Sequence, residues 1–292
     1  MEGPTGPVLS GVSPETSRIF SLALKSLHRE ILENPAPWRD ILIVYALVDP
    51  EVSKSKVLQG LEQGKKKPLP FVEFSFWLQS AWEVFKVTGD KDFLKLVQAH
   101  ADAVMDRSES KMDSRRRYYP VQKEFLPTQM AMAQAWRVLG FTHGVTRFPG
   151  RAVYCEQHFQ KLRSFLETRQ DFQTLSDGIL TNWAMHWDLK PKTGGLFPWS
   201  NLTDSSAGMV ALWVRDSFGI EFQAFQFNFK PHWVCTEKTN PQLNLPFQKG
   251  ILKLTMVKCG EHLKKLVVDG KKTDNLVVSD VDRELNIKLY LE

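Results

Sequence analysis

Carboxylates lie at or just before the start of four strongly apolar segments. Asp40 precedes ILIVYALV, and Glu73 lies in the first turn of FVEFSFWLQSAWEVF. Glu124 lies three residues before Pro127, and Asp204 precedes SSAGMVALWV. Two carboxyl groups at a suitable separation can divide general-acid and general-base work between them. The same residues also suit helix N-termini, where they cap backbone N–H groups and interact favourably with the helix dipole. If these segments form an inner layer of helices, all four carboxylates point to one end.

Glu73 differs from the other three because it interrupts an apolar run. A carboxylate in such a place must be paired, for example with Arg39, or must face a cavity. Glu124 also fits a solvated loop, and Asp204 also fits a plain N-cap.

Tryptophans form the second group of candidate residues. Aromatic rings in binding sites can stack on the apolar faces of sugars, while polar partners hold the hydroxyls. Trp38 and Trp77 lie near Asp40 and Glu73, whereas Trp183, Trp187 and Trp199 form a later cluster. Trp183 and Trp187 are four residues apart and share a helical face, so a core stripe explains them equally well. Trp199 follows a Gly-Gly loop and is the better ligand candidate.

Motifs for other chemistries are missing from the sequence. The chain has no P-loop, GxGxxG, GxSxG or HExxH pattern. His100 with Asp102, and His186 with Asp188, are two residues apart and do not face each other on a helix. We therefore expect no metal site and no cofactor.

The first 219 residues carry helical signals. Ser13-Pro14 starts a helix that stops before Asn34, Gly89 suits a C-terminal cap, Asp90 suits the next N-cap, and Pro127 suits a first helical position. Further helices are predicted over 40–48, 52–62, 71–87, 91–106, 127–139, 151–168, 178–188 and 204–218. Segments that are apolar all round alternate with amphipathic ones, which favours two layers of helical hairpins.

The last 73 residues change character. EFQAFQFNF alternates apolar and polar residues, the period of a half-buried strand. ILKLTMV, LKKLVVDG and ELNIKLYLE alternate in the same way, with Asp269-Gly270 as turn residues. We predict a helical domain over 1–219 and a small antiparallel β-domain over 220–292.

The amino-acid composition excludes several classes of protein. With 42% apolar residues and a net charge of +5 the chain is not disordered, and it has neither an apolar run long enough to span a membrane nor a recognisable signal peptide. Although the pI is near 9.0, the basic residues are spread out, and the short runs Lys65–Lys67 and Arg115–Arg117 read as solvated loops. A nucleic-acid partner is therefore not expected. Three cysteines without a CxxC motif predict free, mostly buried thiols and a cytoplasmic location.

Four segments resemble a known family in its own order. These segments are PWRDILIVYALVDP, FSFWLQSAWEVFKVTGDKDFLK, SSAGMVALWVRDSFGIEFQAFQFNFKP and GILKLTMVKCGEHLKKLVVDGKK. They are similar to the Trp-Arg-Asp hairpin, a buried helix with its Thr-Gly-Asp turn, the last inner helix and the C-terminal strand pair of six-hairpin (α/α)6-barrel glycosidases of the debranching-enzyme and trehalase-like group. The family barrel has twelve helices, and fewer are predicted here, so the resemblance implies an incomplete (α/α) toroid of helical hairpins.

The resemblance implies a carbohydrate-active protein that cleaves a glycosidic bond of an oligosaccharide or small glycoside with a pair of carboxylates. Asp40 is then the general acid and Asp204 the base, with Glu73 and Glu124 as alternates. The tryptophans Trp38, Trp77, Trp183, Trp187 and Trp199 would line the substrate pocket. Two alternatives stay open. They are an inactive carbohydrate-binding or scaffold remnant of such a barrel, and a helical protein-interaction adaptor.

Overall fold

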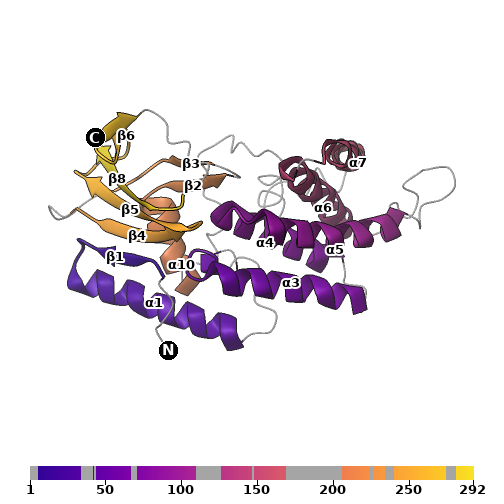
Figure 1. Cartoon of the computed structure of the whole chain (residues 1–292), viewed down its shortest axis with the longest axis horizontal. Coiled ribbons are helices and arrows are strands. Elements are labelled where there is room, and N and C mark those ends of the chain that lie inside the picture. Colours follow the sequence, from indigo (N-terminus) through magenta and orange to yellow (C-terminus); the bar gives the residue numbers. More distant parts are fainter. Residues whose placement is uncertain are drawn as a thin grey trace. The chain divides into compact units, whose positions relative to one another are not determined.

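The computed structural model describes residues 6–33, 42, 44–66, 71–109, 126–146, 148–168, 206–223, 226–233, 240–273 and 281–292. Within these residues the chain is mainly helical, with a separate mixed sheet. Figure 1 shows these helices and strands along the chain. The chain divides into two compact units. Unit 1 comprises Met1–Lys54, Glu83–Asp90 and Asn201–Glu292, and unit 2 comprises Ser55–Trp82 and Lys91–Ser200.

Unit 2 is a helical assembly. It contains α5 (Lys91–Glu109), α6 (Leu126–Val145), α7 (Pro149–Glu167) and most of α3 (Pro50–Lys66) and α4 (Phe71–Thr88). Helices α6 and α7 form an antiparallel hairpin, and α5 packs on α6. Gly89 ends α4 with a φ of 65°, as its predicted capping role requires.

The predicted contrast between helices is confirmed in this unit. In the middle of α6, every residue from Gln129 to Leu139 is buried apart from Arg137, and α4 is buried along most of its length. By contrast, α5 and α7 each bury one stripe and expose the other, as Leu96 and Val153 illustrate. A helix that is apolar all round needs neighbours on all sides, whereas an amphipathic helix can lie at the surface.

Unit 1 is built around a six-stranded sheet with the order β1-β4-β5-β8-β6-β7. The strands are β1 (Val8–Ser10), β4 (Gln242–Phe247), β5 (Gly250–Val257), β6 (Leu263–Val268), β7 (Lys271–Thr273) and β8 (Glu284–Leu291). Helix α1 (Pro14–Glu33) contacts β1 and α10 (Ser206–Ala211). Ser13 caps α1, because its Oγ accepts a hydrogen bond from the Thr16 amide over 3.1 Å.

One face of this sheet forms the core of the unit. Along β4, β5 and β8 buried residues alternate with half-buried or exposed ones, and the buried ones are all apolar. Each such side chain removed from water contributes roughly 1.5–3 kcal/mol before the entropy of ordering is subtracted. The inward set contains Leu243, Leu245, Phe247, Leu252, Leu254, Met256, Leu285, Ile287, Leu289 and Leu291.

The prediction of an antiparallel sheet is wrong at its centre, because β5 and β8 pair in parallel, Leu252 opposite Leu285. The predicted β6–β7 turn is confirmed. Asp269 and Gly270 have φ values of 46° and 82°, the left-handed pair that a two-residue hairpin turn needs.

The segment 221–229 is two strands rather than one. Strands β2 (Ile220–Gln223) and β3 (Gln226–Phe229) pair antiparallel, with Gln223 opposite Gln226. The polar positions are odd-numbered in β2 (Glu221 and Gln223) and even-numbered in β3 (Gln226 and Asn228), so the alternation changes phase between the two strands. Gly219 leads into this hairpin at a φ of 63°, and a Cβ there would lie 2.0 Å from the Lys230 carbonyl.

The predicted domain boundary at residue 219 does not coincide with the two units. Strand β1 pairs with the edge of the sheet through β4, and α1 and α10 belong to the same unit as that sheet. The N-terminal segment therefore belongs to the sheet unit because β1 pairs with β4 through backbone hydrogen bonds. The sequence pattern of this segment does not indicate that pairing.

Glycines in unit 2 provide a test of this packing. We expect Gly60→Ala to lower the free energy of unfolding by about 1–3 kcal/mol, because the new Cβ would lie 2.3 Å from Trp77 Cε2 and overpack the site. Gly144→Ala is the matched control in α6, since a Cβ there meets nothing within 4 Å. The Gly144→Ala substitution should raise the free energy of unfolding by up to about 1 kcal/mol, because alanine has a higher helix propensity than glycine. Denaturant melts of both variants measure the difference, and equal effects would contradict this packing.

Candidate functional site

Two of the residues predicted for a catalytic pocket lie within the described part of the chain. Asp40, Glu124, Asp204, Trp38, Trp183, Trp187 and Trp199 lie outside the described residues. Glu73 and Trp77 lie within them, both on α4.

Glu73 and Trp77 have opposite environments. Glu73 lies in the first turn of α4 with its side chain exposed, so the carboxylate that interrupts an apolar run reaches solvent. Trp77 is only 7% exposed, and its indole ring fills the space beside Gly60. The carboxylate is accessible to a ligand, whereas this indole is part of the core of unit 2.

The interface between α4 and α6 is not purely apolar. The Gln79 Nε2 group donates hydrogen bonds to Gln134 Oε1 and, over 3.0 Å, to Ser75 Oγ. All three side chains are buried, and Gln134 Nε2 has no partner among the described residues. Buried amides are normally paired, so this polar layer inside an otherwise apolar contact is a feature that the sequence reading missed.

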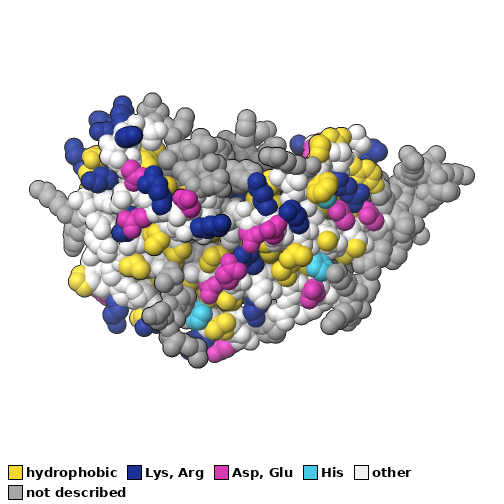
Figure 2. Space-filling model, in the orientation of Figure 1, with side chains coloured by type: hydrophobic (Ala, Val, Ile, Leu, Met, Phe, Trp, Pro, Cys, Tyr) yellow, Lys and Arg dark blue, Asp and Glu magenta, His cyan; other side chains and the backbone are white. Residues whose placement is uncertain are grey.

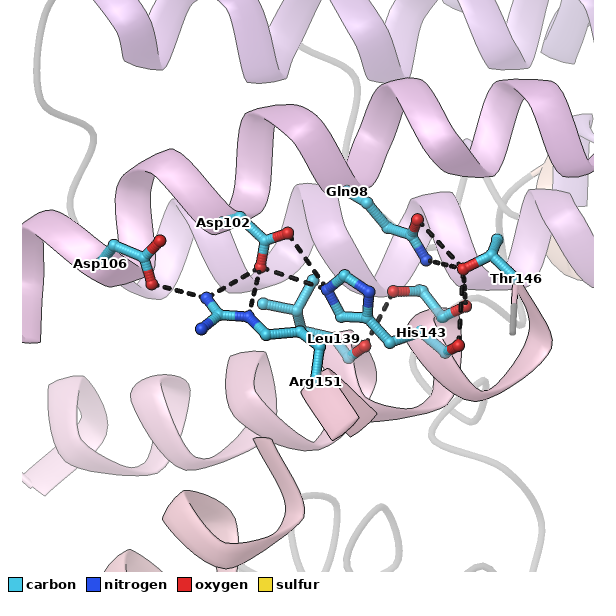
Figure 3. Close-up of polar contacts among 8 residues, drawn as sticks. Gln98, Asp102, Asp106, Leu139, His143, Thr146 and Arg151 are labelled. Atoms are coloured by element: carbon cyan, nitrogen blue, oxygen red, sulfur yellow. Dashed lines mark hydrogen bonds and ion pairs between the residues drawn. The ribbon is translucent and has the colours of Figure 1, made fainter. Parts of the chain in front are cut away.

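A charged cluster joins α5, α6 and α7 (Figure 3). The guanidinium of Arg151, in the first turn of α7, donates to Asp102 Oδ1 through Nε over 3.1 Å and to Asp106 Oδ1 through Nη2 over 2.5 Å. His143, in the last turn of α6, lies with Nε2 3.1 Å from Asp102 Oδ2. A cation at a helix N-terminus is disfavoured by the dipole, and the two aspartates one turn apart on α5 offset that cost.

The electrostatics of Asp102 do not suit a general acid. Burial alone would raise the pKa of its carboxyl, but the hydrogen bond and attraction from His143, followed by those from Arg151, outweigh burial and lower the pKa. A general acid needs a proton near working pH, and Asp102 has lost its own. The cluster therefore fastens three helices together and is not a proton donor.

His143 is held tightly in this cluster. It is 5% exposed, its ring meets Phe148 edge-on with centroids 6.1 Å apart, and its Nδ1 has no partner among the described residues. Because a carboxylate only accepts hydrogen bonds, the Nε2–H donates to Asp102. Nearby, Gln98 Nε2 donates to Thr146 Oγ1 over 2.8 Å and adds a second polar link between α5 and α6.

The cysteines differ from one another. Cys155 on α7 is buried and free, and burial is the main reason why the pKa of its thiol is raised to about 12. Cys259 is disulfide-bonded, and Cys235 lies outside the described residues. The prediction of free thiols is therefore correct for Cys155 and wrong for Cys259, which removes the basis on which a reducing compartment was expected.

A second carboxylate of interest lies in unit 1. Helix α10 continues into a π-helical segment, η4 (Leu212–Ser217), which contains Asp216. Short π-helical segments occur frequently at functional sites. Partial burial raises the pKa of the Asp216 carboxyl, and the charge of Arg215 offsets only part of that rise.

An aromatic pair accompanies this segment. Trp213, three residues before Asp216, lies against Trp233 with ring centroids 5.3 Å apart. Trp213 is buried, whereas Trp233 is half-buried and its Nε1–H is an unpaired donor among the described residues. The sequence reading named neither the tryptophans nor Asp216. In the sequence, Asp216 could have been recognised as an acidic residue close to the end of the apolar run SAGMVALWV.

The surface of the α6–α7 hairpin holds a shallow groove of about 590 Å³. Phe141 and Gly140 on α6 and Val153 and Ala152 on α7 form its apolar part, with polar and charged residues of α7 at the rim. Val153 is 56% exposed. The groove holds no carboxylate pair that could carry out hydrolysis.

Within the described residues, no cluster of three or more His, Cys, Asp or Glu side chains could hold a metal ion. None of the helices there has the length and apolar character needed to cross a membrane. No protein-family model and no curated protein sequence matches the chain.

Asp102 leads to a test of the charged cluster by pH. Its folded-state pKa lies below the unfolded value of about 3.9. The carboxylate therefore adds stability at pH values above about 4, and this contribution is lost as the pH falls through the folded pKa. We expect Asp102→Asn to lower the free energy of unfolding by about 1–3 kcal/mol at pH 7. The difference in stability from the unmodified chain should shrink as the pH falls below about 4.

Asp92→Asn is the control on the same helix. Asp92 is 88% exposed and pairs with Lys95 one turn away, so its loss should change stability by less than about 0.5 kcal/mol. Urea titrations at a series of pH values measure both variants. A gap for Asp102→Asn that does not change with pH would overturn this description of the cluster.

Proposed function

We propose that the chain is a carbohydrate-active protein that hydrolyses a glycosidic bond, built on an incomplete toroid of helical hairpins with the sheet unit attached. In this proposal α4 and α6 belong to the inner layer, and α5 and α7 to the outer one. The alternation of fully buried and half-exposed helices supports that assignment.

The observation that carries the proposal is the environment of Asp216. Hydrolysis of a glycoside needs one carboxyl that retains its proton. Asp216 lies in a π-helical segment beside the Trp213–Trp233 pair, and partial burial raises the pKa of its carboxyl. In unit 2, Glu73 is an exposed acidic residue at the start of a buried helix.

The proposed roles remain those implied by the family resemblance. Asp40 is the general acid and Asp204 the base, with Glu73 and Glu124 as alternates. Asp216 is added as an alternate acid. The substrate is an oligosaccharide or a small glycoside, and Trp199 is the preferred stacking residue.

The groove on α6–α7 favours a second candidate function. An exposed apolar groove with a charged rim is typical of a protein-interaction surface, so a helical adaptor without hydrolytic activity is the alternative. The two functions differ in one measurable respect, because only the first requires turnover of a glycoside.

The test is a hydrolysis assay with the full chain on 4-nitrophenyl α- and β-glycosides and on trehalose. We expect Asp40→Asn and Asp204→Asn each to lower kcat/KM by about 100-fold or more, because general acid–base catalysis contributes 10²–10⁴-fold. Asp282→Asn, at an exposed position before β8, is the control and should retain full activity. No turnover on any of these compounds would reject the proposal in favour of the adaptor.

A second measurement separates the two candidate acids. If Asp216 supplies the proton, Asp216→Asn removes the alkaline limb of the pH profile of kcat/KM, while Asp40→Asn leaves this profile unchanged. If Asp40 supplies the proton, Asp40→Asn removes the alkaline limb and Asp216→Asn leaves the pH profile unchanged. Circular dichroism of each variant confirms that the fold is retained.

A further inference from the structure

The outer face of the six-stranded sheet carries many half-buried and exposed side chains among the described residues. In β4, β5 and β8 the alternate residues that do not enter the core are half-buried or exposed. On β8 this outer set is Glu284, Asn286, Lys288 and Tyr290. The parallel register with β5 and the antiparallel register with β6 place neighbours beside each of them.

Three lysines gather on the β6–β7–β8 side of this face. The register pairs Val267 of β6 with Lys288 of β8 on one side and with Lys272 of β7 on the other. Lys265 lies two residues before Val267 and points to the same face. Since neighbouring strands are about 4.8 Å apart, the backbones of Lys272 and Lys288 are roughly 10 Å apart, with Lys265 about 7 Å along the strand.

These lysines carry charge that the described part of the chain does not neutralise. Lys265, Lys272 and Lys288 are all exposed, and none forms an ion pair with a described residue. The acid on the outer face of β8, Glu284, is already paired with Lys253 over 2.8 Å. Lys and Arg side chains are visible at this end of the sheet, around β6 (Figure 2).

An aromatic ring and neutral polar groups lie beside the lysines. Tyr290 is opposite Lys265, whose Nζ lies 5.3 Å from the ring centroid. Asn286, Thr255 and Asn244 continue the same outer face across β8, β5 and β4. Amides and hydroxyls of this kind exchange hydrogen bonds with hydroxyl groups, and a tyrosine ring offers an apolar surface to the C–H face of a sugar.

We propose that this outer face, centred on Lys265, Lys272, Lys288 and Tyr290, binds an acidic polysaccharide. The lysines supply charge complementarity to carboxylate or sulfate groups, and the neutral polar row supplies partners for the sugar hydroxyls. A single-stranded nucleic acid is disfavoured because base-stacking platforms present several aromatic rings, and Tyr290 is the one aromatic residue on this face among the described strands. The choice of a glycan rests on the proposed carbohydrate function, but binding here needs no hydrolysis.

The test is binding of the full chain to immobilised heparin and to polygalacturonate at low salt. We expect Lys265→Gln, Lys272→Gln and Lys288→Gln together to weaken both affinities by about tenfold or more. Binding by the unmodified chain should also fall as salt is raised, since exposed charges are screened over about 8–10 Å. Lys91→Gln, Lys95→Gln and Lys161→Gln together are the matched control, because they remove the same charge from helices of unit 2.

Three outcomes would overturn the inference. The first is no binding to either acidic glycan, and the second is equal loss in the control triple variant. The third is affinity for oligo-dT or for phosphatidylserine vesicles equal to that for the glycans. Tyr290→Leu separates ring stacking from charge. It should weaken glycan binding about threefold while the salt dependence is retained, and thermal melts check its fold.

The same preparations distinguish this inference from the proposed hydrolysis. The Asp40→Asn variant should bind heparin and polygalacturonate as well as the unmodified chain does. Binding without any glycoside turnover would reject the hydrolase and retain the sheet site. Turnover without binding to the acidic glycans would reject the sheet site and retain the hydrolase.

Discussion

The insertion of the last strand between β5 and β6 is the constraint on which the sheet unit depends. Strand β8 pairs in parallel with β5 and antiparallel with β6, so the order of the sheet is set only when the end of the chain has joined it. Its alternate residues supply four apolar side chains to the core and four side chains to the outer face. A shift of one residue would exchange the two sets, so the same register that closes the core also places Lys288 and Tyr290 beside the lysines of β6 and β7.

Local features of the fold could be predicted from the sequence, and long-range ones could not. Caps and breakers such as Ser13, Gly89 and Asp269-Gly270 act within a few residues, so they mark the ends of helices and a turn correctly. The parallel pairing of β5 with β8 joins segments about 30 residues apart and leaves no trace in the alternation of either strand, because period two is common to parallel and antiparallel pairs. The alternation of polar and apolar residues changes phase between Gln223 and Gln226, and this change is a local sign that β2 and β3 are separate strands.

The same limit applies to the candidate sites. Glu73 was identified because it breaks an apolar run, which is visible in one dimension. Arg151 and Asp102 are 49 residues apart, and no local pattern connects them. Two aspartates thus acquire opposite proton affinities from their surroundings, with Asp102 beside a guanidinium and an imidazole and Asp216 partly withdrawn from water.

The buried thiol of Cys155 makes unit 2 able to report on its own opening. With a pKa near 12 and no solvent access, almost none of this thiol is present as thiolate at neutral pH in the closed hairpin. Alkylation therefore requires α7 to separate from α6 first. The labelling rate of an unmodified chain becomes a direct measure of how often this hairpin opens, and it resolves motions of one unit that a global melt would average with those of the other.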